Sequence, residues 1–241
     1  MSRADAAHGV ERLIERKSEL AGRAAAGPVA KRLRELRAWQ AARLARTYED
    51  LRQHDPSVGG ALNFFLSDLY GPQDLTGRDQ DLARAWRLLK RALPPRMLEV
   101  LSMAMELDIL STELDLEMAE RLPPGPLTAK AYAETYRAVG RPEARRRQIA
   151  LVAETGSALA RAVRMPLVRL GLRAAHGPAI VAGFGALQDF LERGFKAFRG
   201  LPDPTQFLAV IEQRESQLME VLLAGGTISA ASPAAAGRGS S

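Results

Sequence analysis

Hydrophobic side chains recur every three or four residues along most of the chain, the spacing typical of amphipathic helices. Runs in which apolar and polar residues alternate, as in half-buried strands, are absent. Glycine and proline interrupt the helical pattern, for example at Gly71-Pro72, Pro94-Pro95 and Pro123-Pro124. The pattern therefore predicts helices at 9–24, 30–53, 60–70, 78–92, 96–122, 128–139, 142–164, 166–175, 179–199 and 204–224.

Short connections separate these helices, and short connections place neighbouring helices antiparallel. The expected fold class is all-α: a single multi-helix bundle, orthogonal or up-down, of about 8–10 helices. We expect a charged, loosely docked helix at 1–25 and an all-helical domain at 26–224. Residues 225–241 are small and nearly uncharged, which predicts a disordered tail.

Composition narrows the class of protein. The chain has 241 residues, of which 46% are apolar, so it can bury a sizeable core. It has no cysteine, which excludes disulfides, thiolate metal sites and thiol nucleophiles. No segment reaches the ~18 apolar residues that span a bilayer, and the first twenty residues contain no apolar signal core. We therefore expect a cytoplasmic protein that does not bind a membrane.

The net charge of +6 and the pI of about 10.0 suggest nucleic-acid binding. However, 29 of the 34 basic residues are arginine, a bias that a GC-rich genome produces without selection for binding DNA. Nucleic-acid binding through the arginine-rich helices 30–53 and 142–164 is therefore an alternative and is not the favoured function.

The helix at 97–120 carries seven carboxylates and no lysine or arginine. Its leucine and isoleucine residues lie almost all round the helix, which predicts a central position. Buried carboxylates need partners, and arginine can bond a carboxylate with two parallel hydrogen bonds. Residues 141–173 have a net charge of +6 and residues 1–53 a net charge of +5. We therefore expect basic helices to enclose and neutralise this acidic helix.

The same acidic helix permits a second interpretation. Glu113, Glu117 and Glu120 lie close on one side of it and could hold a hard cation such as Mg²⁺. A pocket or enzyme site built on Glu106, Glu113, Glu117 or Tyr70 is a related alternative. The Glu-x-x-His pairs of di-iron bundles are absent. No cofactor is predicted.

The stretch FFLSDLYGPQDLTGRDQDLARAW at 64–86 gathers aromatic and acidic residues around a Gly-Pro turn. Helix capping accounts for most of its carboxylates; Asp68, Tyr70 and Asp74 could instead form a small polar site at the turn. The FFL-x-D-LYGP segment, with the following D-x-x-x-RD, resembles the signature of a family of uncharacterised bacterial all-helical proteins. LARTYEDL at 44–51 is similar to the same family's lead-in. The resemblance covers residues 44–91 and implies a shared helical domain; no particular activity can be transferred from it.

Two single residues are further candidates. Trp39 lies away from the apolar face of helix 30–53, among Arg32, Arg43 and Arg46, where it could pack on the N-terminal helix or anchor a partner. His176 precedes Gly177-Pro178, so it is either a residue that ends a helix or the proximal ligand of a haem.

No catalytic residues are predicted, because the phosphate-binding loop, the dinucleotide-binding fingerprint and Gly-x-Ser-x-Gly are absent. The favoured function is a non-enzymatic protein-interaction or regulatory module that binds a protein through its basic N-terminal face and Trp39. A small-molecule, metal or haem protein or enzyme, with its site in the helical core, is the first alternative, and nucleic-acid binding is the second.

Overall fold

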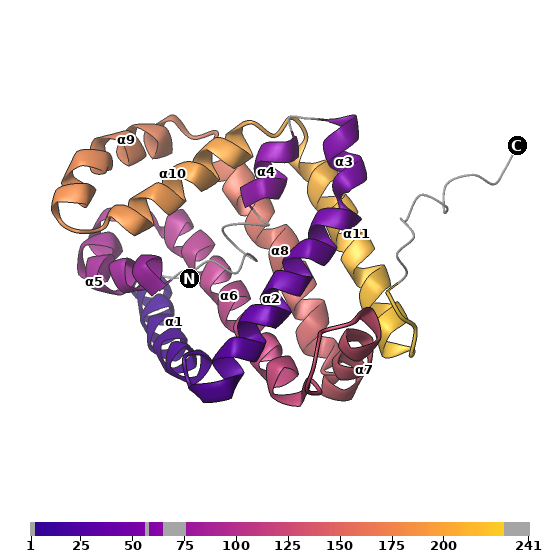
Figure 1. Ribbon diagram of the computed structural model, residues 1–241. Helices are drawn as coiled ribbons and strands as arrows, with labels where there is room; N and C mark the ends of the chain where they lie inside the picture. The colour runs from indigo at the N-terminus through magenta and orange to yellow at the C-terminus, as the bar shows by residue number, and fades with distance from the viewer. Residues whose placement is uncertain (1–2, 56–57, 65–75, 229–241) are drawn as a thin grey trace, which may run out of the picture.

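The computed structural model describes residues 3–55, 58–64 and 76–228, which form eleven α-helices and no strand (Figure 1). The all-α fold class predicted from the sequence is confirmed. The helices are α1 (Arg3–Ala24), α2 (Gly27–Thr47), α3 (Glu49–His54), α4 (Val58–Phe64), α5 (Thr76–Ala92), α6 (Pro95–Arg121), α7 (Ala129–Val139), α8 (Pro142–Ala162), α9 (Pro166–Val181), α10 (Gly185–Arg199) and α11 (Pro204–Leu223).

Helix α6 occupies the centre of the molecule. It packs against α1, α2, α7 and α8, and α11 packs on α7 and α8 from the far side (Figure 1). Three hydrophobic clusters fill the interior, and α6 contributes Leu98, Leu107 and Leu116 to one cluster each. Because a single helix supplies all three clusters, its apolar residues must lie on several faces, as the sequence indicated.

Helix α1 lies along α6, with Val10 and Leu20 fully buried. The sequence predicted only loose docking because few apolar residues occur in this segment. Those few coincide with the buried face, and basic side chains on the same helix bind α6. Most of the tail expected to be disordered, residues 229–241, lies outside the described residues, and Ile228 packs against the core.

The predicted helix 30–53 is two helices. Tyr48 separates α2 from α3 with a non-helical backbone, φ −112° and ψ 12°. Its side chain is buried, and its hydroxyl donates a hydrogen bond to Glu215 on α11. We attribute the break to this tertiary anchor, since neither glycine nor proline occurs there.

The predicted break at His176-Gly177-Pro178 is wrong. Helix α9 continues through Pro178 to Val181, and the chain turns at Gly183, whose φ is +77°. A proline inside a helix removes one backbone hydrogen bond. Here the residue one turn earlier, Ala174, is exposed, so water can bond the carbonyl that Pro178 leaves without a donor.

Phe64 is buried at the end of α4, with its ring 5.3 Å from that of Phe190 and 6.4 Å from that of Phe198. A Cβ on Gly194 would lie 2.9 Å from the Phe64 ring, so α10 needs glycine at this contact. The polar turn candidates Asp68, Tyr70 and Asp74 lie outside the described residues.

Candidate functional site

Six of the seven carboxylates on α6 pair with basic side chains from α1, α2 and the start of α8. This confirms the prediction that basic helices enclose and neutralise the acidic one. Most of these carboxylates are half-buried, where an ion pair offsets the cost of removing charge from water. The pairs are Arg16–Glu113, Lys17–Asp108, Arg23–Glu120, Arg37–Asp115, Arg141–Glu117 and Arg147–Glu106.

The three candidate metal ligands are bound to three different arginines. Glu113 contacts Arg16 at 2.6 Å and Glu120 contacts Arg23 at 3.1 Å, whereas Glu117 pairs with Arg141. Among the described residues, no three histidine, aspartate or glutamate side chains gather into a group that could hold a metal ion. The structure thus does not bring these three carboxylates together.

Asp115 is the most enclosed acid of α6. Burial raises the pKa of its carboxyl, and the hydrogen bonds from Arg37 and Gln40, both at 3.1 Å, oppose that rise. Both of its oxygens accept a bond from α2. This arrangement fixes α2 on α6 with its polar atoms satisfied.

The four candidate partner-binding residues of α2 do not share one free surface. Trp39 stacks on Tyr132 of α7, with ring centroids 4.3 Å apart and an interplanar angle of 23°. Arg46 is exposed, whereas Arg43 is buried. Trp39 thus faces a second packing partner, α7, and not the N-terminal helix that the sequence suggested.

Arg43 lies in a closed polar cluster between α2 and α11. Its Nη1 contacts the Glu215 carboxylate at 2.6 Å, and the Tyr48 hydroxyl donates to the same oxygen at 2.8 Å. Burial opposes the charge on Arg43, but Glu215 outweighs it and raises the pKa of the guanidinium. Burial, together with the Glu215 carboxylate, raises the pKa of the Tyr48 hydroxyl. Arg43 and Tyr48 therefore keep their protons at neutral pH.

A second buried arginine, Arg145 on α8, lies over the ring of Tyr136, with its guanidinium carbon 3.4 Å from the ring centroid. Its Nε donates to the carbonyl of Gly140 at 2.9 Å. Burial raises the pKa of Tyr136 to about 12. A general base works best with a pKa near the working pH, and this phenol is shifted away from neutrality.

His176 lies inside α9, so the expectation that it ends a helix is wrong. Its Nδ1 is 2.7 Å from a carboxylate oxygen of Glu192 on α10. A hydrogen bond from Gln188, followed by that from His176, lowers the pKa of Glu192. Half of the histidine side chain is exposed, and it links the two helices of the α9–α10 hairpin.

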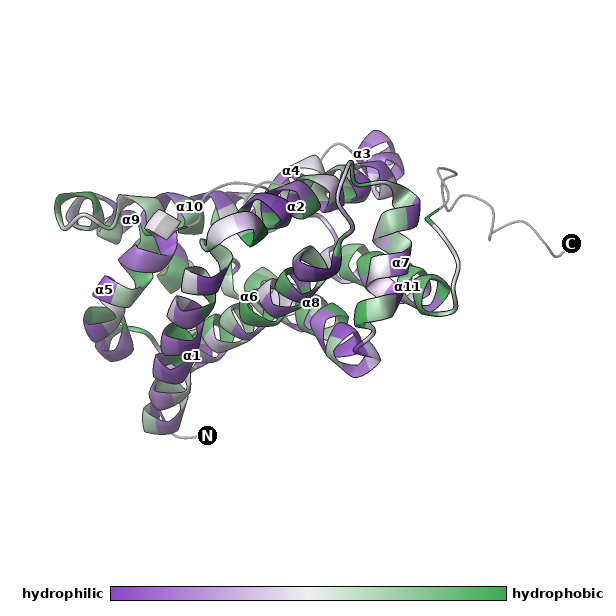
Figure 2. Ribbon diagram, turned by 60° about the horizontal axis from the view of Figure 1, so that its bottom comes forward, coloured by the Kyte–Doolittle hydropathy of each residue, from purple (hydrophilic) through white to green (hydrophobic). Residues whose placement is uncertain are grey.

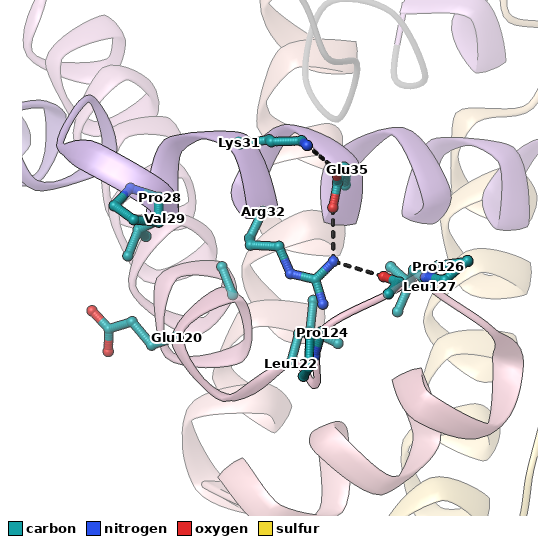
Figure 3. Close-up of a pocket in the computed structure, with 12 residues that line it drawn as sticks. Pro28, Val29, Lys31, Arg32, Glu35, Glu120, Leu122, Pro124, Pro126 and Leu127 are labelled. Carbon is teal, nitrogen blue, oxygen red and sulfur yellow. Dashed lines mark hydrogen bonds and ion pairs between the residues drawn. The ribbon is translucent and has the colours of Figure 1, made fainter.

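A groove of about 800 Å³ separates the start of α2 from the segment that joins α6 to α7 (Figure 3). Prolines and leucines from that segment, among them Leu122, Pro124 and Leu127, form its apolar side. Arg32 spans it and bonds Glu35 (Figure 3). It also donates to the backbone carbonyls of Pro123 and Gly125. The Arg32 guanidinium is thus bonded within the chain and links α2 to the segment between α6 and α7.

Helix α9 carries four large hydrophobic side chains that are exposed, Leu167, Leu170, Ile180 and Val181. It contains no buried residue, and Leu167, Leu170 and Val181 are 77%, 61% and 90% exposed. Figure 2 shows α9 at the edge of the molecule with hydrophobic residues along it. At 100° per residue, one side of the helix, which we name the outer face of α9, consists of Leu167, Leu170, Gly171, Ala174, Gly177, Pro178 and Val181, all exposed.

A basic groove of about 540 Å³ is lined by residues of α9 and α10. Its α9 residues lie on the side of the helix turned away from the outer face, and Arg173 is the one nearest to that face. Leu172 and Phe195 form its apolar floor. Its charged lining is Arg169, Arg173, Lys196, Arg199 and Glu192. Residues 161–200 carry seven basic and two acidic side chains, a net of +5 in a chain of net +6. This segment, from the end of α8 to the end of α10, is thus strongly basic.

Sequence reasoning missed the outer face of α9 and the basic groove. The signal was present: Arg169, Arg173 and His176 share one narrow polar side of residues 166–181, so the apolar part of this helix is wider than the face that a surface helix usually buries. Ending the helix at residue 175 removed Pro178 and Val181 from the pattern. The remaining stretch was too short to show a face.

Residues 19–228 match the family described as "Domain of unknown function (DUF8198)". No curated protein and no solved structure matches the chain. None of the described helices is both long enough and apolar enough to cross a bilayer. Since the match covers most of the chain, this all-helical protein belongs to the DUF8198 family, whose function is not known, which agrees with the resemblance to an uncharacterised helical family.

Proposed function

We propose that the chain is a non-enzymatic protein-interaction module whose docking surface is the outer face of α9. The observation that carries the proposal is the exposure of Leu167, Leu170 and Val181 on one side of a single helix. Contiguous exposed apolar side chains mark binding surfaces in soluble proteins. Covering them in a complex would supply the hydrophobic driving force that the folded chain leaves unused.

The distribution of charge supports this site over the N-terminal face predicted from the sequence. On α2, Arg37 and Arg43 are bonded to carboxylates of the same chain, and on α8 Arg147 is bonded to Glu106 and Glu154. Arginines that are already paired have little to offer to phosphate groups. The second alternative, nucleic-acid binding through these helices, is therefore less favoured. The cytoplasmic location stays a prediction.

Site-specific photo-crosslinking in the cells that make the protein tests the proposal. A benzophenone amino acid replaces Leu170 in one full-length variant and Leu88 in the other. Leu88, on α5, is the matched control because its side chain is 65% exposed and apolar but lies outside α9. We expect one recurrent protein adduct from position 170 and none from position 88.

A second substitution ties the adduct to the outer face. Val181→Asp, on the same side of α9 as Leu170, is expected to abolish the adduct without changing the circular dichroism of the chain, since Val181 is 90% exposed. Equal adducts from positions 88 and 170, or no recurrent adduct from position 170, would show that α9 is not a docking surface.

A further inference from the structure

We infer that the partner segment is an acidic amphipathic helix that crosses the middle of α9 and places carboxylates beside Arg173, at the edge of the basic groove. This inference rests on the proposed function and adds the chemistry of the partner. Shape and charge support it independently.

The shape of the outer face fits a crossing helix. Leu167 and Leu170 stand at one end and Val181 at the other, about 21 Å apart along the axis at 1.5 Å per residue. Gly171, Ala174 and Gly177 lie between them and form a saddle. A Cβ placed on either glycine meets no atom within 4 Å, so the saddle is open.

Helices pack at axis separations that depend on the side chains at the contact, and small residues permit the closest approach. A bilayer surface makes different demands, because interfacial helices present large leucine and aromatic side chains along their apolar face. Glycine and alanine in the centre of the face are suited to another helix and contribute little to insertion into lipid.

The positive charge next to the outer face of α9 indicates that the facing side of the partner helix carries carboxylates. Arg173 is three residues after Leu170 and four before Gly177, so it borders the saddle. Among the described residues, no ion pair involves Arg169, Arg173, Lys196 or Arg199, all of which line the basic groove. Carboxylates on the partner helix would meet Arg173, and the other three cations add to the positive potential there. A second copy of this chain would instead place like charges together, which is unfavourable.

The test uses the full-length chain and two synthetic helical peptides with the same leucine and alanine face, one flanked by glutamates and the other by lysines. We expect the glutamate peptide to bind about tenfold or more tightly than the lysine peptide, and to weaken as salt rises, because the attraction is electrostatic. Fluorescence anisotropy measures both affinities. Equal affinities, or no binding of the glutamate peptide, would overturn the inference.

The substitution Gly171→Leu distinguishes binding to a partner helix from binding to a membrane surface. The added side chain meets open space within the chain and improves helix propensity, so the fold is retained. It fills the saddle, and we expect the affinity for the glutamate peptide to fall about tenfold or more, as overpacking of a contact predicts. Leu88→Ala, on α5, is the control and should leave that affinity unchanged.

Vesicles of phosphatidylcholine and phosphatidylglycerol provide the contrasting probe. On a membrane surface Gly171→Leu adds apolar area and should strengthen binding, so vesicle binding that increases with this substitution would contradict the acidic-helix inference. A dimer that Gly171→Leu dissociates would contradict it as well. If the crosslink at position 170 forms but the peptides do not differ, only the partner chemistry is wrong; without the crosslink, the proposed function itself fails.

Discussion

Replacing Glu215 with alanine is expected to destabilise the fold by about 3–5 kcal/mol, the cost of leaving a buried charge without its partner. Arg43 is only 7% exposed, and its ion pair with Glu215 measures 2.6 Å. Tyr48 would lose its acceptor in the same substitution. Urea unfolding followed by circular dichroism measures the loss of unfolding free energy.

Removing the whole cluster should cost much less than removing Glu215 alone. The triple variant Arg43→Met, Tyr48→Phe, Glu215→Leu leaves no buried charge or hydroxyl unpaired, and such replacements of buried ion pairs are often neutral. Glu134→Ala, which breaks an exposed pair with Lys130, is the matched control and should have little effect. If Glu215→Ala lowers the unfolding free energy no more than Glu134→Ala does, the Arg43–Glu215 pair does not stabilise the fold as described above.

Trp39→Ala is expected to destabilise the fold by about 2–4 kcal/mol, somewhat less than a fully buried aromatic residue because the side chain is partly exposed. Its stack on Tyr132 joins α2 to α7. Trp39→Phe keeps an aromatic ring at this contact and should lose much less. Thermal unfolding of the two variants provides the comparison.

The same substitution also separates the two candidate docking surfaces. The folded Trp39→Ala protein, kept below its melting temperature, should still form the crosslink from position 170. Loss of that crosslink in a protein that remains folded would favour Trp39 as the partner-binding residue, as the sequence suggested.

The hydrophobic spacing and the net charges of the segments predicted that α6 is central, because both can be read from the residues of each segment without knowing the fold. An apolar helix with seven carboxylates needs cationic partners, and the segments with an excess of arginine supplied them. Arg37 and Arg147 show the result: each bonds an acid of α6 from the helix expected to provide it.

The features that sequence reasoning missed depend on packing between distant segments. The break at Tyr48 is held by Glu215, 167 residues later in the chain. The sequence analysis assumed that α2 buries only one face, so it placed Trp39 outside the core. In the structure α2 buries two faces, one against α6 and the other, with Trp39, against α7. Helical periodicity reveals that a side chain lies on another side of the helix but not that a second helix covers that side.

The outer face of α9 was hidden for a related reason. An apolar pattern predicts burial, and nothing in residues 166–181 distinguishes a face buried inside the chain from one left for a partner. Only the placement of α9 against α10, at the edge of the fold, makes that distinction.

The central claim is that Arg37 and Arg43 are bonded to carboxylates and Arg145 is buried against Tyr136 within the fold, whereas Arg173 and Arg199 of the basic groove have no ion pair among the described residues. Phenylglyoxal labelling of the native chain, with mass spectrometry of each modified arginine over time, measures this directly. The account predicts that Arg173 and Arg199 react well before Arg37, and that Arg43 and Arg145, which are buried, react only after unfolding. Equal labelling rates across these five arginines in the folded chain would contradict it.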